Sequence, residues 1–118
     1  MNDLAIAVGA VASDVSRIGA VLGAAGVGLE GGGVWAGQAR YLVADGAVAV
    51  AALDAAGIRA TAAPALVVSL RADVPGEMGR MMSALHSAGI RVEAQYSDHD
   101  NRKVFVVDDV ERARTVLG

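Results

Sequence analysis

Apolar and polar side chains alternate along the C-terminal half in a way that predicts five elements. The run Ala65–Leu70 predicts a strand, since it is short and bounded by Pro64 and Asp73. Apolar residues then recur at helical spacing at Met78, Met81, Met82 and Leu85. A half-buried strand from Ile90 to Gln95, an apolar strand at Val104–Val107 and a final helix carrying Val110, Ala113, Val116 and Leu117 follow.

Residues with special backbone preferences mark where these elements begin and end. Pro75 suits the first turn of a helix, where its missing N–H group would have no partner anyway. Gly89 is placed to end that helix as the glycine just beyond it. The polar segment Ser97–Arg102 predicts a hairpin turn, and Asp108 or Asp109 caps the last helix.

The N-terminal half has the same order of elements. The predicted segments are strand Leu4–Val8, helix Ser13–Ala25 capped by Ser13, strands Val27–Trp35 and Arg40–Ala44, helix Gly46–Ala56 and a short strand Ile58–Thr61.

Sliding the chain along itself reveals an internal repeat at an offset of 63 residues. It pairs Arg17 with Arg80, Leu22 with Leu85, Ala25 with Ala88, Gly26 with Gly89, Glu30 with Glu93, Val43 with Val106 and Asp45 with Asp108. We therefore predict an α+β protein of two ferredoxin-like βαββαβ repeats, residues 1–63 and 64–118, with antiparallel sheets and helices on one face. Repeat 2 stops at Gly118, before its own last strand, so another segment or a second chain is expected to fill that strand position.

Composition narrows the classes of function. The net charge is −3, and no basic run offers the clustered cations that a nucleic-acid partner needs. The absence of cysteine excludes disulfides, thiolate zinc sites and a cysteine nucleophile. The apolar start has no basic leader and is interrupted by Asp14 and Arg17, which predicts neither a signal peptide nor a membrane span. We expect a cytoplasmic protein.

Two stretches of repeat 2 resemble a known family. An apolar strand leads into Asp73-Val74-Pro75-Gly76, and a helix then ends in Ala88-Gly89-Ile90. This is similar to the opening of an ACT domain, which has an apolar strand, Asp-x-Pro-Gly and a helix ending in Ala-Gly-Ile. The resemblance covers nearly all of repeat 2, whereas the corresponding loop of repeat 1, residues 11–15, lacks the Asp-x-Pro-Gly motif. Small tandem ACT-domain proteins form a recognisable group within the family.

The resemblance implies a regulatory module that binds a free amino acid where two domains meet. The loop it implies consists of Asp73, Val74, Pro75, Gly76, Glu77 and Met78. The strand it implies opposite that loop is Glu30–Val34, which contains Gly31, Gly32 and Gly33. The chemistry of a helix N-terminus supports this loop independently, because unpaired N–H groups and partial positive charge suit a carboxylate. Gly76 would let a ligand approach the backbone, and Asp73 could accept a hydrogen bond from its ammonium group. The alternative is that Asp73 only caps the helix and that Pro75 and Gly76 only shape its start.

Other motifs have simpler explanations. The string Gly26–Gly31 matches G-x-G-x-x-G, but it follows a predicted helix and enters a strand, the reverse of the dinucleotide-binding order. The glycine triplet marks a bulge, a close backbone approach or room for a ligand. Trp35 is interpreted as a packing residue at a strand end, with contact to a ligand as the alternative. Asp98-His99-Asp100 has metal-ligand residue types but is interpreted as a solvated hairpin tip, and His86 as a surface residue.

We therefore expect no enzyme, no cofactor and no metal site. The principal hypothesis is an amino-acid-binding regulatory module that forms a homodimer and acts through a separate enzyme or regulator, with no nucleic acid and no membrane partner. The alternative is a structural or oligomerisation protein without a ligand. A small enzyme would need a nucleophile and base pair, and the two histidines, His86 and His99, lie in no such context.

Overall fold

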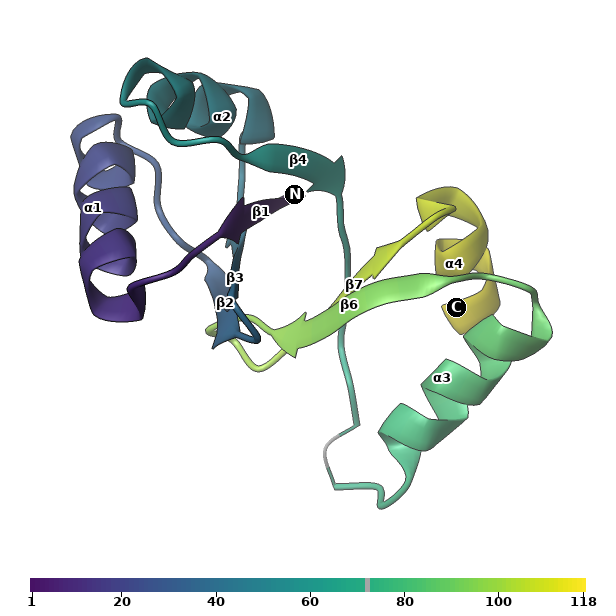
Figure 1. Ribbon diagram of the computed structural model, residues 1–118. Helices are drawn as coiled ribbons and strands as arrows, with labels where there is room; N and C mark the ends of the chain where they lie inside the picture. The colour runs from purple at the N-terminus through teal and green to yellow at the C-terminus, as the bar shows by residue number, and fades with distance from the viewer. Residues whose placement is uncertain (72) are drawn as a thin grey trace. The chain divides into compact units, whose positions relative to one another are not determined.

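The computed structural model describes residues 1–71 and 73–118 (Figure 1). Ala72, which follows the strand of the ACT-like stretch, lies outside the described residues. Contacts divide the chain into two compact units, Met1–Pro64 and Ala65–Gly118. We call them unit 1 and unit 2 and describe each separately.

Unit 1 is a four-stranded antiparallel sheet with two helices. Its elements are β1 (Asn2–Ala7), α1 (Val11–Ala24), β2 (Gly31–Trp35), β3 (Gln38–Val43), α2 (Gly46–Ala55) and β4 (Thr61–Pro64). The strand order is β2-β3-β1-β4, so the first strand lies inside the sheet and β2 and β4 form its edges. Leu4 faces Tyr41 across β1 and β3, and Gly32 faces Tyr41 across β2 and β3.

The core of unit 1 lies between the sheet and its helices. Alternate residues of β1, Leu4 and Ile6, are buried together with Ile18 and Leu22 of α1 and Leu53 of α2. This arrangement explains why the period of apolar residues changes from two in the strand to three and four in the helices.

Unit 2 repeats the plan with three strands among the described residues. Its elements are β5 (Leu66–Val68), α3 (Glu77–Ser87), β6 (Val92–Ser97), β7 (Lys103–Val107) and α4 (Val110–Leu117). The strand order is β5-β7-β6, the same relative order as β1-β3-β2 of unit 1. Leu85 and Phe105 are fully buried at its centre. A β-bulge between Val92 and Ala94 shifts the register of β6 against β7.

The predicted fold class is confirmed. The protein is α+β, its strands pair antiparallel, and the elements follow the ferredoxin-like order. In each unit the two helices lie beside each other, α1 with α2 and α3 with α4.

Three helices end in the same way, which confirms the predicted role of Gly89. In α3 the amide of Gly89 donates to His86 O at 3.0 Å, and the amide of Ile90 donates to Leu85 O at 3.0 Å. This pair of bonds is a Schellman motif, which requires the left-handed backbone that Gly89 adopts at φ 73°. Gly26 after α1 and Gly57 after α2 make the equivalent bonds. The G-x-G-x-x-G string therefore begins at a helix end, the wrong context for a dinucleotide.

Helix starts differ from the sequence predictions in two places. Ser13 does not cap α1, because the helix begins at Val11 with Ala10 as the N-cap residue, and Asp14 instead accepts a hydrogen bond from the amide of Gly9 at 2.8 Å. Pro75 is not in the first turn of α3, because Gly76 is the N-cap residue at φ 86°, a conformation outside the α-helix. Asp109 caps α4 as predicted, accepting from the amide of Arg112 at 3.0 Å.

Two strands of unit 1 begin later than predicted. β2 begins at Gly31 and β4 at Thr61, rather than at Val27 and Ile58. The reason is the same in both cases: the amides of Val27 and Ile58 complete the Schellman motifs of the preceding helices. Within the described chain, no helix has the length and apolar character needed to cross a membrane.

Candidate functional site

The loop that the resemblance implies, residues 73–78, lies in unit 2 before α3. The amide of Val74 donates to Arg71 O at 3.0 Å, and the amide of Glu77 donates to Val74 O at 3.3 Å. These two turns bring the chain to Gly76, whose left-handed backbone starts the helix. The loop is thus shaped by its own backbone hydrogen bonds and by one glycine.

The start of α3 is open. Asp73, Pro75 and Gly76 are exposed, and a Cβ atom built on Gly76 would meet no other atom within 4 Å. Among the described residues, the amides of Met78 and Gly79 donate to no protein acceptor, as is usual for a first helical turn without a cap. Free N–H groups and the positive end of the helix dipole thus meet an exposed surface, an arrangement that favours negative charge.

One charged pair borders this helix start. The Arg80 guanidinium donates to Glu77 Oε1, with Nε at 3.0 Å, and forms an ion pair with it. The hydrogen bond from Arg80 is the main reason why the pKa of Glu77 is lowered, and the bond to Glu77 raises the pKa of Arg80. Glu77 is therefore charged at neutral pH, and Arg80 balances its charge beside the first turn.

The glycine triplet belongs to unit 1, on the edge strand β2. A Cβ atom on Gly32 would lie 2.0 Å from the carbonyl oxygen of Arg40, and Gly32 has φ 121°. A Cβ atom on Gly33 would lie 2.7 Å from the ring of Trp35, so the indole covers Gly33 on the same face of the strand. Close approach of the β3 backbone and of one aromatic ring thus explains two of the three glycines without a ligand.

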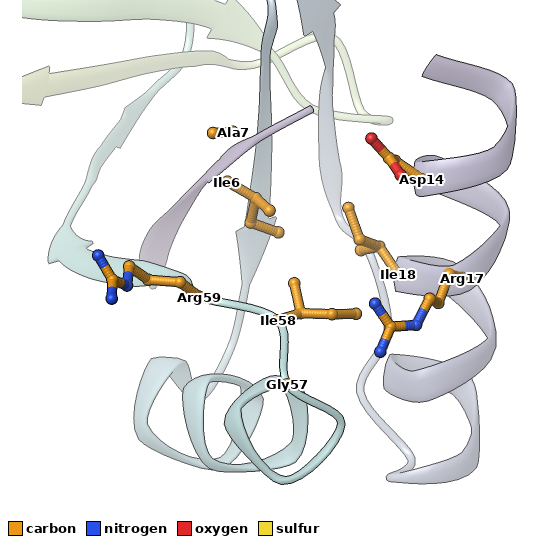
Figure 2. Close-up of a pocket in the computed structure, with 8 residues that line it drawn as sticks. All are labelled: Ile6, Ala7, Asp14, Arg17, Ile18, Gly57, Ile58 and Arg59. Atoms are coloured by element: carbon orange, nitrogen blue, oxygen red, sulfur yellow. The ribbon is translucent and has the colours of Figure 1, made fainter. Parts of the chain in front are cut away.

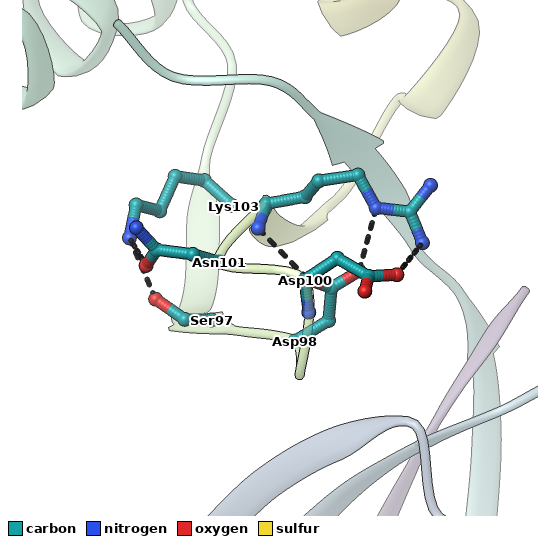
Figure 3. A network of polar contacts seen from close by, with 6 residues as sticks. Ser97, Asp98, Asp100, Asn101 and Lys103 are labelled. Carbon is teal, nitrogen blue, oxygen red and sulfur yellow. Dashed lines mark hydrogen bonds and ion pairs between the residues drawn. The ribbon is translucent and has the colours of Figure 1, made fainter. Parts of the chain in front are cut away.

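The hairpin tip between β6 and β7 differs from the prediction of a solvated turn. Figure 3 shows the polar contacts around Asp98, whose side chain is only 1% exposed. Its Oδ1 atom accepts from the amides of Asp100 and Arg102 at 3.0 and 2.8 Å. Its Oδ2 atom accepts from Arg102 Nε at 2.7 Å. Asp98 is therefore a structural carboxylate that closes the turn, while His99 and Asp100 are exposed.

Among the described residues, no group of three acidic or histidine side chains is placed to hold a metal ion. His86, predicted to be a surface residue, is exposed on α3.

Unit 1 contains a cavity that the sequence analysis missed (Figure 2). Its volume is about 240 Å³. The residues that line it are Ile6, Ala7, Asp14, Arg17, Ile18, Gly57, Ile58 and Arg59. They come from β1, from α1 and from the segment between α2 and β4, which the fold brings together. One signal was present in the sequence, because the repeat pairs Arg17 with Arg80. Both are exposed helix positions in the structure, where packing does not demand an arginine.

Comparisons by sequence and by structure gave different results. The sequence matches no family model, and a comparison with curated proteins also found no match. The fold is similar to a protein from Bacteroides thetaiotaomicron, with a TM-score of 0.79 and 20% identity over 98% of this chain and 85% of that one. It is also similar to the regulatory subunit of aspartate kinase from Thermus thermophilus, with a TM-score of 0.71 and 17% identity over 98% of this chain and 86% of that one. The corresponding subunit from Thermus flavus has a TM-score of 0.70 and 20% identity over 98% and 87% of the two chains. At identities of 17–20% the likeness establishes the fold alone, an α+β arrangement of antiparallel sheets and helices like that of these solved structures.

Proposed function

We propose that this chain is a regulatory module that binds a free amino acid and acts through a separate protein, with no catalysis of its own. The observation that carries the proposal is the open start of α3, where exposed Asp73 and Gly76 precede the unpaired amides of Met78 and Gly79. The likeness to two aspartate kinase regulatory subunits supports the same class of function. An enzyme whose activity responds to an amino acid is the kind of partner that we propose.

The chemistry assigns a role to each part of the loop. The ligand carboxylate would accept hydrogen bonds from the first-turn amides of α3, where the helix dipole favours negative charge. The ligand ammonium would donate to the exposed carboxylate of Asp73. For about 10 heavy atoms at roughly 0.5 kcal/mol each, the binding free energy would be about 5 kcal/mol, which corresponds to sub-millimolar affinity.

We expect at least one natural amino acid to raise the melting temperature of the chain. A ligand at about 50 times its Kd stabilises the folded state by about 2 kcal/mol, which raises the melting temperature of a domain of this size by several degrees. The measurement is a thermal unfolding curve with each of the twenty amino acids. Asp73→Asn should abolish the part of the shift that comes from binding at this loop, whereas Asp100→Asn, an exposed aspartate in a turn of the same unit, should retain it. If all twenty leave the melting curve of the unsubstituted chain unchanged, the proposal is wrong.

We also propose that the chain works as a homodimer. The supporting observation is that β5 pairs only with β7 among the described residues, so one side of β5 lies at the edge of its sheet, and an unpaired edge is a site for strand addition. In unit 1 the equivalent side of β1 is covered by β4. Sedimentation over a range of concentrations should give a dimer mass, and a monomer at every concentration would contradict this part of the proposal.

A dimer that forms while all amino acids leave the melting curve unchanged would favour the alternative function, an oligomerisation protein without a ligand. The two measurements therefore separate the two candidate functions.

A further inference from the structure

We propose that the cavity in unit 1 is a second binding site, for a zwitterionic amino acid with a short aliphatic side chain. It is independent of the loop in unit 2, because all of its lining residues belong to unit 1. The proposal therefore stands whether or not the loop at residues 73–78 binds a ligand.

The cavity has an apolar floor and two opposite charges. Figure 2 shows Ile6, Ile18 and Ile58 between the first strand and α1, with Asp14 and Arg17 on the same helix. Ile6 and Ile18 are each only 2% exposed, so they belong to the packed core that closes the bottom of the cavity, whereas Ile58 is half-buried. An aliphatic group placed on this floor would leave water for an apolar surface, which is favourable.

Two hydrogen bonds hold the opposite charges apart. The carboxylate of Asp14 accepts from the amide of Gly9 at 2.8 Å, at the N-terminal end of α1. One turn further along, Arg17 Nη2 donates to the carbonyl oxygen of Ala56, at the C-terminal end of α2. Each side chain is thus directed to a different backbone segment, and the two form no ion pair with each other within the described chain.

The corresponding pair of unit 2 is arranged differently. At the repeat offset, Asp14 corresponds to Glu77 and Arg17 to Arg80. Glu77 and Arg80 close on each other in an ion pair along α3. An acid and an arginine three residues apart on a helix usually pair in this way. Their separation in unit 1 leaves a carboxylate available to an ammonium group and a guanidinium available to a carboxylate.

The size and access of the cavity restrict its occupant. A volume of about 240 Å³ is below the range of roughly 300–1,000 Å³ that is typical for drug-sized ligands, so a molecule of amino-acid size fits best. Ala7, Arg17 and Gly57 are exposed at its rim, which leaves it open to solvent. Arg59 also lines the cavity, and in the view of Figure 2 its guanidinium points away from that of Arg17, so we assign the carboxylate to Arg17.

The isoleucines of this chain make a direct test possible. The sequence has four: Ile6, Ile18 and Ile58 line the cavity, and Ile90 lies in unit 2. NMR of the full chain with labelled isoleucine and methionine methyl groups, titrated with L-leucine, should show saturable shifts of the three cavity isoleucines and none of Ile90. The methyl group of Met78 reports separately on the loop before α3. If the methyl signal of Met78 shifts and those of the cavity isoleucines do not, the loop binds the ligand and the cavity proposal is wrong.

Charge-removing variants test the assigned contacts. Arg17→Gln should weaken binding of L-leucine roughly tenfold to a hundredfold, the usual effect of losing a charge-assisted hydrogen bond. Its matched control is Arg80→Gln, the equivalent position of unit 2, which should leave the titration of the cavity isoleucines unchanged. Asp14→Asn retains an acceptor for the Gly9 amide but loses the charge, and we expect a similar weakening. Asp100→Asn, an exposed position of unit 2, makes the same charge change outside the cavity.

Ligand analogues test the proposal without any substitution. Isoamylamine lacks the carboxylate of L-leucine, and isocaproate lacks its ammonium group. Both should bind at least roughly tenfold more weakly than L-leucine if each charge is used. Equal affinity for L-leucine and isocaproate would overturn the role of Asp14. Isoleucine signals that stay unmoved by both L-leucine and L-valine would overturn the site itself.

Discussion

Replacing Gly32 by alanine is expected to unfold unit 1 or to leave it only marginally stable. The new Cβ atom would lie 2.0 Å from the carbonyl oxygen of Arg40 and 2.9 Å from the Cα atom of Tyr41. Both atoms are backbone of the neighbouring strand β3, so no side-chain rotation can relieve the clash. The φ angle of 121° adds strain for any residue with a Cβ atom. We expect a loss of more than about 3 kcal/mol, a large part of the stability of a small domain.

The only tryptophan of the chain makes this loss measurable in unit 1. Trp35 lies on the same strand as Gly32, so its fluorescence during urea unfolding reports on unit 1. The control is Gly19→Ala in α1, where a Cβ atom meets nothing within 4 Å. That substitution should stabilise unit 1 by roughly 0.5–1 kcal/mol through helix propensity. A Gly32→Ala chain as stable as the unsubstituted one would show that β2 and β3 do not approach each other as described.

Replacing Asp98 by alanine is expected to destabilise unit 2 by about 3 kcal/mol. The substitution removes an almost fully buried carboxylate that accepts hydrogen bonds from two amides and from Arg102 Nε. Leaving a buried donor without an acceptor lowers the free energy of unfolding by more than the hydrogen bond itself had contributed. The control is Asp100→Ala, whose side chain is 78% exposed and which lies 3.9 Å from Arg102. An exposed pair of that kind contributes about 0–1 kcal/mol.

The effect of Asp98 should also depend on pH. Burial raises the pKa of Asp98, but the hydrogen bonds and the charge of Arg102 outweigh burial, and the pKa is lowered overall. A lowered pKa in the folded state means that the carboxylate stabilises unit 2 fully above the ordinary aspartate pKa of about 3.9. That stabilisation is lost as the pH falls through the folded-state pKa.

Urea unfolding of the unsubstituted chain and of Asp98→Asn, at a series of pH values, measures this dependence. The buried Phe105 in unit 2 gives an NMR signal that follows unfolding of that unit. The difference in unfolding free energy between the two chains should be constant near neutral pH and shrink below about pH 4. A difference that grows on acidification would contradict the lowered pKa.

The two proposed sites differ in how they are built, and that difference would affect which ligands each one binds. The loop before α3 consists of consecutive residues, so a ligand there would be recognised mainly by hydrogen bonds from backbone amides. The cavity of unit 1 is built from side chains of separate elements, so it can select for the shape of an aliphatic group. If both sites bind, the chain would combine a general amino-acid site with a more selective one.

The resemblance to the ACT-domain family and the structural comparison support each other only at the level of the fold. The Asp-x-Pro-Gly loop was identified from its residues, and the similar solved structures include two regulatory subunits. The structure adds that the loop is open and that its helix start has unpaired amides. It also removes one argument for a ligand near β2, because close packing accounts for Gly32 and Gly33.

Local chemistry alone determined the succession of elements in this protein. Gly26, Gly57 and Gly89 end helices because only glycine readily adopts the left-handed backbone of a Schellman motif, and Gly26 and Gly89 are one of the residue pairs of the repeat. Apolar periodicity determined which residues enter each core, since burial follows directly from the geometry of a strand or helix.

Tertiary structure decided whatever depends on contacts between distant segments. The sequence offers both Ser13 and Asp14 near the start of α1, and only the turn after β1 determined that Asp14 would bond to Gly9. Asp98 was predicted to be solvated, because the sequence does not indicate that Arg102 and two amides converge on its carboxylate. The cavity arises where residues about 40 positions apart in sequence, Arg17 and Ile58, meet. Periodicity describes one element at a time, whereas a binding site is a property of the space between several.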